Sequence, residues 1–325
     1  MSTVRTAPSS GVSFLVLAGI LWGTGGLFGR MLGDATGLSS LAVATYRLAV
    51  GGLLLVGYLL VTGARLPRSR AAWARIAAVA ALAALFQVSY FTAVWFTSVS
   101  VATLVTIGSS PVLVLLAGTR WRSARASRRR CVDDSPADAR SLARPRGADR
   151  PGFVAVGLAL CGLLLLIGVP TDAGPSTAAV LAGAACALVA ASGFTAVSLL
   201  GARPVPGLDA TATAGLGFTL GGALLVPLAL TTSGLTFAPT PVAIGLLVAF
   251  GLLPTAVAYT CYFRGLRSAA AGVGVLMALL EPVTSAVLSA VLLGDRLGVS
   301  GIAGGLLLCA ALVLTARGQG RTRSS

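Results

Sequence analysis

Residues 279–314 read LLEPVTSAVLSAVLLGDRLGVSGIAGGLLLCAALVL, and the pattern in this stretch decides the fold. The stretch joins most of two apolar blocks, which lie near residues 268–293 and 298–316. Each block has about 20 residues, and an α-helix of that length spans the roughly 30 Å hydrocarbon layer of a bilayer. We therefore expect two consecutive transmembrane helices here.

The rest of the chain repeats this pattern. Hydrophobic residues make up 56% of the 325 residues and charged residues only 10%, whereas soluble domains contain about 25% charged residues. Eight further apolar blocks lie near residues 13–32, 39–61, 73–95, 99–119, 152–170, 177–200, 210–231 and 240–263. The sequence therefore predicts an all-α integral membrane protein with ten transmembrane helices.

The arginines indicate how these helices are oriented. All 24 basic residues are arginines. If residues 1–12 and 317–325 are cytoplasmic tails, 21 arginines lie in cytoplasmic segments and two, Arg30 and Arg296, lie on the opposite side. This excess follows the positive-inside rule. We expect a multi-pass protein of a bacterial plasma (inner) membrane with both termini in the cytoplasm.

The chain also contains a weak internal repeat. At an offset of 170, residues 51–56 match residues 221–226 in five of six positions, and at an offset of 171 Pro111 coincides with Pro282. Two consecutive units of five helices must have opposite orientations because five is odd. Inverted repeats of this kind are common in secondary transporters that work by alternating access. The sequence therefore predicts two inverted five-helix repeats.

We place the first repeat at residues 13–170 and the second at residues 177–316. The first repeat includes a basic cytoplasmic loop at about residues 120–150, which mixes Arg, Asp, Ser and Pro without apolar periodicity. This loop is either a tolerated insertion that reinforces orientation or a segment attracted to anionic lipid headgroups.

The composition argues against several classes of function. The net charge of +15 is distributed between apolar blocks, so we expect no nucleic-acid partner. The chain has no histidine and no CxxC motif, so we expect no metal and no cofactor. Because an enzyme would need convergent acid, base or metal groups and the chain has one glutamate, we expect no enzyme activity. No ATP-binding loop occurs in a hydrophilic segment.

Several motifs resemble the EamA-type family of the drug/metabolite transporter superfamily. They are ILWGTGG at residues 20–26, YRLAVGG at residues 46–52, SSPVLVLLAG at residues 109–118 and, above all, the stretch at residues 279–314. The resemblance covers nearly the whole chain. It implies a ten-helix transporter fold with a central cavity, usually exporting metabolites, amino acids or toxic compounds.

Two ionisable residues inside the predicted helices are candidates for transport. Glu281 lies about halfway along the block at 268–293, where an ionisable side chain should face the bundle interior or a water-filled cavity. It either carries a proton or binds a cationic substrate group, or it is a structural acid before Pro282. Arg47 either extends to the outer headgroups or packs between helices, or it meets a substrate carboxylate or Glu281.

Further candidates are polar or aromatic side chains within apolar blocks. A polar amide beside aromatic rings suits an amphipathic ligand, although such groups also bond neighbouring helices or anchor the chain at the interface. The predicted substrate-binding or coupling residues are Glu281, Gln87, Tyr90, Tyr259, Trp22, Arg47 and Ser110. Pro111 and Pro282 are predicted hinges, because proline inside a helix removes a backbone hydrogen bond and favours a kink.

We expect a secondary transporter that exports small organic metabolites, amino acids or drug-like compounds by alternating access, with proton coupling through Glu281 as one mechanism. The alternative is a lipid or lipid-linked sugar flippase of related fold. The expected partners are a small-molecule substrate and the lipid bilayer, and the sequence leaves open whether the chain forms a homo-oligomer.

Overall fold

The computed structural model describes residues 9–64, 66–97, 101–103, 105–114, 116–117, 150–167, 176–232, 234–269, 271–292 and 299–321. These residues form helices joined by short connections, with one isolated β-bridge between Val205 and Leu208. In the first half the helices are α1 (Ser9–Thr36), α2 (Ser40–Val61), α3 (Arg70–Phe96) and α6 (Arg150–Ile167), and residues 101–103, 105–114 and 116–117 are also helical.

The second half also consists of helices, but some of them are divided into shorter consecutive elements. Its elements are α7 (Thr177–Gly201), α8 (Ala210–Thr232), α9 (Pro241–Gly251), the π-helix η1 (Leu252–Val257), α10 (Ala258–Ser268), α11 (Ala271–Met277), α12 (Leu280–Leu292) and α13 (Val299–Arg321). The elements α9, η1 and α10 follow one another directly. Two residues separate α11 from α12.

Polar residues begin the helices at the ends of the apolar blocks. The side chains of Ser39, Ser69, Ser176, Thr240 and Asp209 each accept a hydrogen bond from the backbone N–H three residues later. Such N-caps satisfy donors that the first helical turn leaves without partners. The helix starts predicted from composition are therefore reinforced by local hydrogen bonding.

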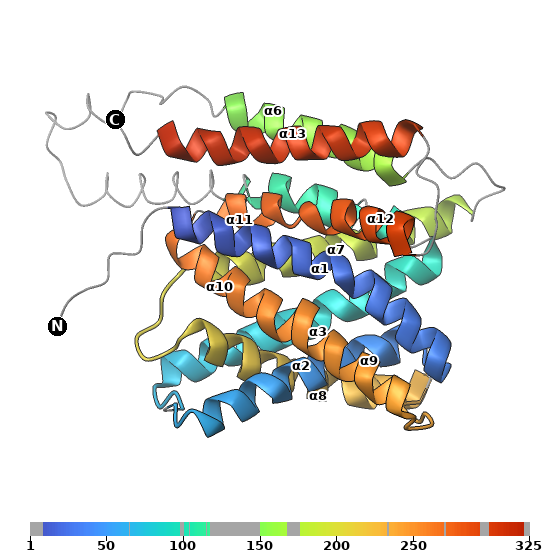
Figure 1. The fold of residues 1–325 in the computed structure, drawn as a ribbon, viewed down its shortest axis with the longest axis vertical. Helices are drawn as coiled ribbons and strands as arrows, with labels where there is room; N and C mark the ends of the chain where they lie inside the picture. Colours follow the sequence, from blue (N-terminus) through green and yellow to red (C-terminus); the bar gives the residue numbers. More distant parts are fainter. Residues whose placement is uncertain are drawn as a thin grey trace, which may run out of the picture.

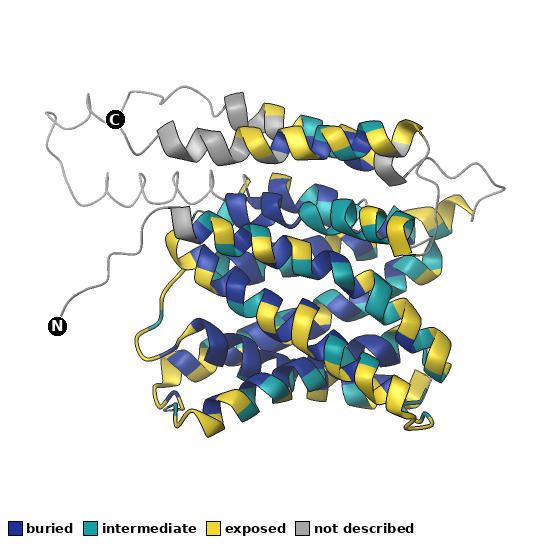
Figure 2. Cartoon of the chain, in the orientation of Figure 1, coloured by how far each residue is buried: buried dark blue, intermediate teal, exposed yellow. Residues whose placement is uncertain are grey.

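The helices lie side by side in a bundle (Figure 1). α2 packs against α8, α3 against α7 and α8, and α1 against α10 and α12. α6 and α13 pack against each other along their length and form a separate layer at the top of the view. Buried residues are concentrated inside the bundle, and exposed residues follow its outline (Figure 2).

The two ends of the bundle are defined by long-range hydrogen bonds. At the end where α1 begins, which we call the proximal end, Arg75 donates to the carbonyl oxygens of Leu200 and Arg203, and Arg267 donates to that of Leu208. At the opposite, distal end, the Tyr46 hydroxyl donates to the carbonyl oxygen of Leu235 at 2.6 Å. The connection between α1 and α2 lies at this distal end.

Close contact between α2 and α8 depends on two glycines. A Cβ atom at Gly52 would lie 2.3 Å from the Thr219 backbone nitrogen, and one at Gly222 would lie 2.8 Å from the Ala49 backbone nitrogen. Both distances are shorter than real Cβ contacts. Small residues at such crossings let membrane helices approach closely.

The described helices have the dimensions of membrane spans. Seven spans are long and apolar enough to cross a bilayer, of which Pro241–Ser268 combines α9, η1 and α10 and Ala271–Leu292 combines α11 and α12. Shorter apolar helices run over Val101–Val114 and Ile302–Ala311. Large side chains such as Leu60, Leu181 and Leu306 are more than 60% exposed on the outside of the bundle. An all-helical membrane fold is confirmed, while the count of ten helices in two repeats stays a prediction.

We predict that Gly52→Val destabilises the bundle. Its side chain would meet backbone atoms of α8 that cannot move independently, and overpacking costs about 1–3 kcal/mol of unfolding free energy. Gly57→Val on the same helix is the control, because nothing lies within 4 Å of a Cβ atom there. Melting of the two purified variants in detergent tests this, and equal melting temperatures would contradict it.

Candidate functional site

A cavity of about 800 Å³ lies inside the bundle, between α1, α2, α3, α7, α9–α10, the helical residues 103 and 105–110, and the interruption between α11 and α12. Its lining reaches the α1–α2 connection at Gly37 and Leu38, at the distal end. Among the described residues, none of those that line it belongs to the α2–α3 or α7–α8 connection at the proximal end. The volume falls within the range of small-molecule sites.

Aromatic side chains form the proximal floor of this cavity. The Trp22 ring lies 4.9 Å from the Tyr259 ring, 4.8 Å from Tyr262 and 5.9 Å from Phe194, measured between centroids. Tyr262 is fully buried, and its hydroxyl is 2.7 Å from the Ser198 hydroxyl. This packing separates the cavity from the proximal end.

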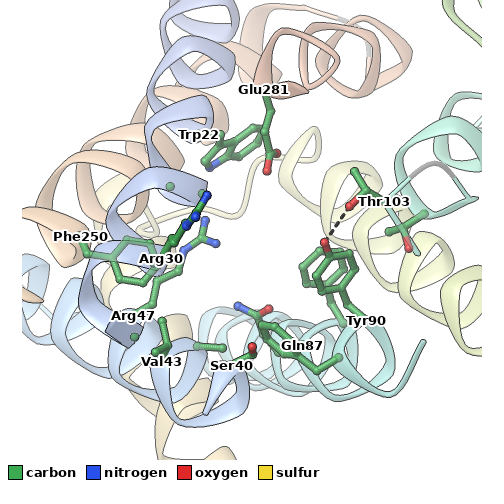
Figure 3. A pocket seen from close by; sticks show the side chains of 18 of the residues that line it. Trp22, Arg30, Ser40, Val43, Arg47, Gln87, Tyr90, Thr103, Phe250 and Glu281 are labelled. Carbon is green, nitrogen blue, oxygen red and sulfur yellow. Dashed lines mark hydrogen bonds between the residues drawn. The ribbon is translucent and has the colours of Figure 1, made fainter. Parts of the chain in front are cut away.

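All seven side chains predicted for substrate binding or coupling line this one cavity: Glu281, Gln87, Tyr90, Tyr259, Trp22, Arg47 and Ser110. Figure 3 shows Glu281 of α12, Arg47 of α2, and Gln87 and Tyr90 of α3 around the same open space. The structure thus brings together residues that lie up to 259 positions apart in the chain. Their roles in transport stay predictions.

Arg47 is held by the irregular segment of the second half. Its Nε donates to the Thr255 hydroxyl at 3.2 Å, and its Nη2 donates to the Pro254 carbonyl oxygen at 3.4 Å. Its guanidinium carbon lies 5.4 Å from the centroid of the Phe250 ring, within cation–π range. Arg47 therefore packs between helices and lines the cavity.

The anchor of Arg47 depends on Pro254. Proline has no N–H, so the Phe250 carbonyl oxygen loses its usual helical donor. The Thr255 hydroxyl donates to this oxygen at 3.1 Å, inside the π-helix Leu252–Val257. The same hydroxyl accepts a hydrogen bond from Arg47. One threonine therefore satisfies the Phe250 carbonyl oxygen and also positions the guanidinium.

Glu281 lies directly after the interruption between helices α11 and α12. α11 ends at Met277, Ala278 and Leu279 form a turn, and Glu281 and Pro282 lie in the first turn of α12. The Glu281 backbone N–H donates to Ala278 three residues back, at 3.0 Å, which is a tighter turn than an α-helix. Pro282 thus borders a break, whereas Pro111 lies inside the continuous helical stretch 105–114.

The other predicted polar residues have different surroundings. The Tyr90 hydroxyl is 2.7 Å from the Thr103 hydroxyl. Ser110 is fully buried and donates to the Thr106 carbonyl oxygen at 2.7 Å, so its hydroxyl already has a protein partner. Gln87 is 5% exposed, and its amide points toward the open space in Figure 3.

Several lining residues were not predicted as binding residues from the sequence. Phe250, Phe194 and Thr103 carried no signal that distinguishes them from ordinary packing residues. The glycines Gly25, Gly26 and Gly29 of α1 line the cavity and share one helix face. Their clustering in WGTGGLFG at residues 22–29 was the available signal.

Comparison with known proteins identifies the family. The model of the EamA-like transporter family matches residues 9–128 and 177–317. The chain belongs to the EamA-like transporter family. This family is part of the drug/metabolite transporter superfamily, so the resemblance seen in the sequence is confirmed. The chain is accordingly a multi-pass membrane transporter.

Individual relatives agree with this assignment. This EamA-like chain is 28% identical over 307 residues to the "Uncharacterized transporter YwfM" of Bacillus subtilis (strain 168). The matched region covers 93% of each protein. A solved crystal structure matches with a TM-score of 0.72 and 18% identity, over 95% of this chain and 99% of the other. The structural match shows a shared fold.

We predict unequal costs for breaking the hydrogen bond between Tyr262 and Ser198. Ser198→Ala leaves the buried phenol without its partner, which costs about 1–3 kcal/mol of unfolding free energy. Tyr262→Phe costs less, because the Ser198 hydroxyl still donates to the Phe194 carbonyl oxygen. Thermal unfolding of both variants tests this order. The double variant should resemble Tyr262→Phe, and a lower melting temperature for Tyr262→Phe than for Ser198→Ala would contradict the prediction.

Proposed function

We propose that this chain is a secondary transporter that exports a small organic solute through its cavity by alternating access. The observation that carries the proposal is the cavity itself, which is reached from the distal end and closed toward the proximal end by the aromatic floor. Such a site binds a solute from one side. To release it on the other side, the floor must open and the distal end must close.

Reciprocal contacts between the halves support an arrangement of two inverted five-helix repeats. Gly52 meets Thr219, and Gly222 meets Ala49. The offset from residue 52 to 222 and from 49 to 219 is 170 in both cases, so each contact is the copy of the other with the halves exchanged. The same holds for Gly51 against the Gly251 carbonyl oxygen and Gly221 against that of Ala80, at offsets of 170 and 171.

The helix pairs follow the same exchange. α3 packs against α7, as α10 packs against α1. α2 packs against α8, and α6 packs against α13. The two helices of each pair occupy matching positions in the two halves, so exchanging the halves leaves the pair unchanged. Two five-helix units with boundaries near 13–170 and 177–316 account for this pattern, and the odd number of spans makes them inverted.

The described arginines support a cytoplasmic proximal end. Arg75, Arg203 and Arg267 gather there, where their side chains or backbone join α3, α7, α8 and α10. The positive-inside rule places such residues in the cytoplasm of a bacterial plasma membrane. In this orientation both termini are cytoplasmic and the cavity faces the outside.

Glu281 is the residue we propose for proton coupling. It is the single glutamate of the chain and lies at the break between α11 and α12. The other charged or titratable side chains that line the cavity are Arg30, Asp34, Arg47, Tyr90 and Tyr259. A carboxyl group that faces each side of the membrane in turn can take up a proton on one side and release it on the other.

The break beside Pro282 supports its role as a hinge, because the backbone between Met277 and Leu280 is already outside α-helical geometry. Pro111 occupies the matching repeat position within a continuous helix, and we propose that it bends in the opposite conformation. The flippase alternative gains no support, since the cavity lining reaches the α1–α2 connection at an end of the bundle.

We predict that Glu281→Gln abolishes transport driven by a proton gradient. The amide cannot exchange a proton, so the gradient can no longer move the solute. A screen of radiolabelled organic solutes in proteoliposomes with an imposed pH gradient measures this. Glu281→Asp is the control that keeps the carboxyl group, and solute exchange without a gradient should survive in both variants. Flux in Glu281→Gln that still follows the gradient would contradict proton coupling.

We predict that the two ends of the bundle are labelled from opposite sides. In a background without the native cysteines, Ser40→Cys should react with a membrane-impermeant maleimide in intact cells. Arg203→Cys should react only after the membrane is opened. Labelling of both positions in intact cells, or of Arg203→Cys alone, would overturn the proposed orientation.

A further inference from the structure

We infer that the solute carries an anionic oxygen group that pairs with Arg47 and an apolar body that contacts the aromatic walls of the cavity. This inference rests on the proposed function and names the substrate class of the same site. The relevant chemistry is that of an organic carboxylate or a similar oxyanion.

The first support is that Arg47 has neutral partners. Its close contacts are with the Thr255 hydroxyl, the Pro254 carbonyl oxygen and the Phe250 ring. Among the described residues, the one ion pair within 4 Å joins Arg30 and Asp34 at the mouth of the cavity, 3.9 Å apart. The contacts of Arg47 therefore fix the position of its charge without neutralising it. Arg47 is half-buried in the cavity wall, and a charge that is partly removed from water is costly without a close counter-ion, so a site of this kind favours an anion.

The second support is the geometry of the guanidinium. It has five N–H donors in a planar fork that matches a carboxylate. Two of its nitrogens, Nε and Nη2, donate to Thr255 and Pro254 of η1. Figure 3 shows the side chain extending toward the open space that Glu281 and Gln87 also face. These hydrogen bonds orient the guanidinium before an anion binds. Binding therefore restricts the anion and costs little additional entropy of the Arg47 side chain.

The third support is the composition of the surrounding wall. Phe86, Phe91, Phe194, Ile107 and Val43 line the cavity along with the polar groups. These side chains offer apolar contact to a ring or an alkyl body, while Arg47 and Gln87 offer polar contact at one side. An organic anion of amphipathic character matches this division better than an inorganic anion does.

Glu281 gives this inference a consequence for coupling. Among the described lining residues away from the mouth, Glu281 is the acid and Arg47 is the base, so these two side chains can carry opposite charges at neutral pH. When Glu281 is ionised, it offsets the charge of Arg47 and repels a solute anion. When Glu281 takes up a proton, the solute anion becomes the counter-ion of Arg47. Proton and organic anion therefore bind together and are carried in the same direction, so export of the solute down its own gradient carries a proton outward with it.

Equilibrium binding to the purified full-length protein tests the inference. The probes are 3-phenylpropionate and 3-phenylpropionamide, which share one body and differ in charge. The wild type should bind the carboxylate at least about tenfold more tightly than the amide. Its affinity for the carboxylate should be higher at about pH 6 than at about pH 8, because protonated Glu281 no longer repels the anion. The probe itself stays ionised over that range, so its own charge does not change. Glu281→Gln should bind the carboxylate equally well at both values.

The Arg47 variants provide the decisive comparison. Arg47→Gln should lose at least about tenfold in affinity for the carboxylate and keep its affinity for the amide, which also shows that the variant is folded. Arg47→Lys keeps the charge without the fork and should lie between. Arg264→Gln is the matched control, because it removes an exposed arginine of α10 that does not line the cavity.

The inference is overturned if the wild type does not bind the carboxylate up to its solubility limit. It is also overturned if the wild type prefers the amide, or if Arg47→Gln keeps the preference for the carboxylate. Gradient-driven flux of another solute would in that case leave the proposed transport function intact. Conversely, Arg47-dependent binding without flux in proteoliposomes would contradict the transport function and not the inference.

Discussion

The hydrocarbon layer offers no water to backbone N–H and C=O groups, and the structure depends on this constraint. Each spanning segment must satisfy its own backbone, so the described residues are arranged as helices with caps at their ends. Lipid does not drive the helices together as water would, so close packing must hold them. The α2–α8 crossing, where Gly52 and Gly222 admit the partner backbone, is the clearest such contact.

In the part of the chain that the structure describes, two interruptions of regular α-helix lie next to residues that line the cavity. The π-helix Leu252–Val257 contains Pro254 and Thr255, which hold Arg47, and the turn at Ala278 and Leu279 precedes Glu281. Irregular backbone at membrane depth is tolerated where it is buried in protein or lines a cavity. Both of these segments belong to the second half of the chain, and one lies beside Arg47 and the other beside Glu281. The irregular backbone and the two charged residues are therefore found together at the cavity.

The polar groups of the cavity divide into those that build the walls and those that remain available to a solute. Ser110 donates to Thr106, and Tyr90 is paired with Thr103, so these hydroxyls contribute first to helix packing. Arg47 and Glu281 carry charges that the described contacts leave without a close opposite partner. This difference is the reason that the proposed coupling involves these two residues and assigns the serine and tyrosine a lining role.

The sequence by itself determined the helical membrane class, the family and the candidate residues, because each of these depends on local composition. Apolar blocks, rare ionisable residues and prolines are visible without knowing what they touch, and the offset of 170 already aligned Gly52 with Gly222. The tertiary structure alone decided that Arg47 contacts Thr255, 208 positions away, that Phe250 and Phe194 line the cavity, and that the aromatic floor closes its proximal side. These features follow from how the helices pack and rotate against one another, which depends on contacts between distant segments that no local pattern specifies.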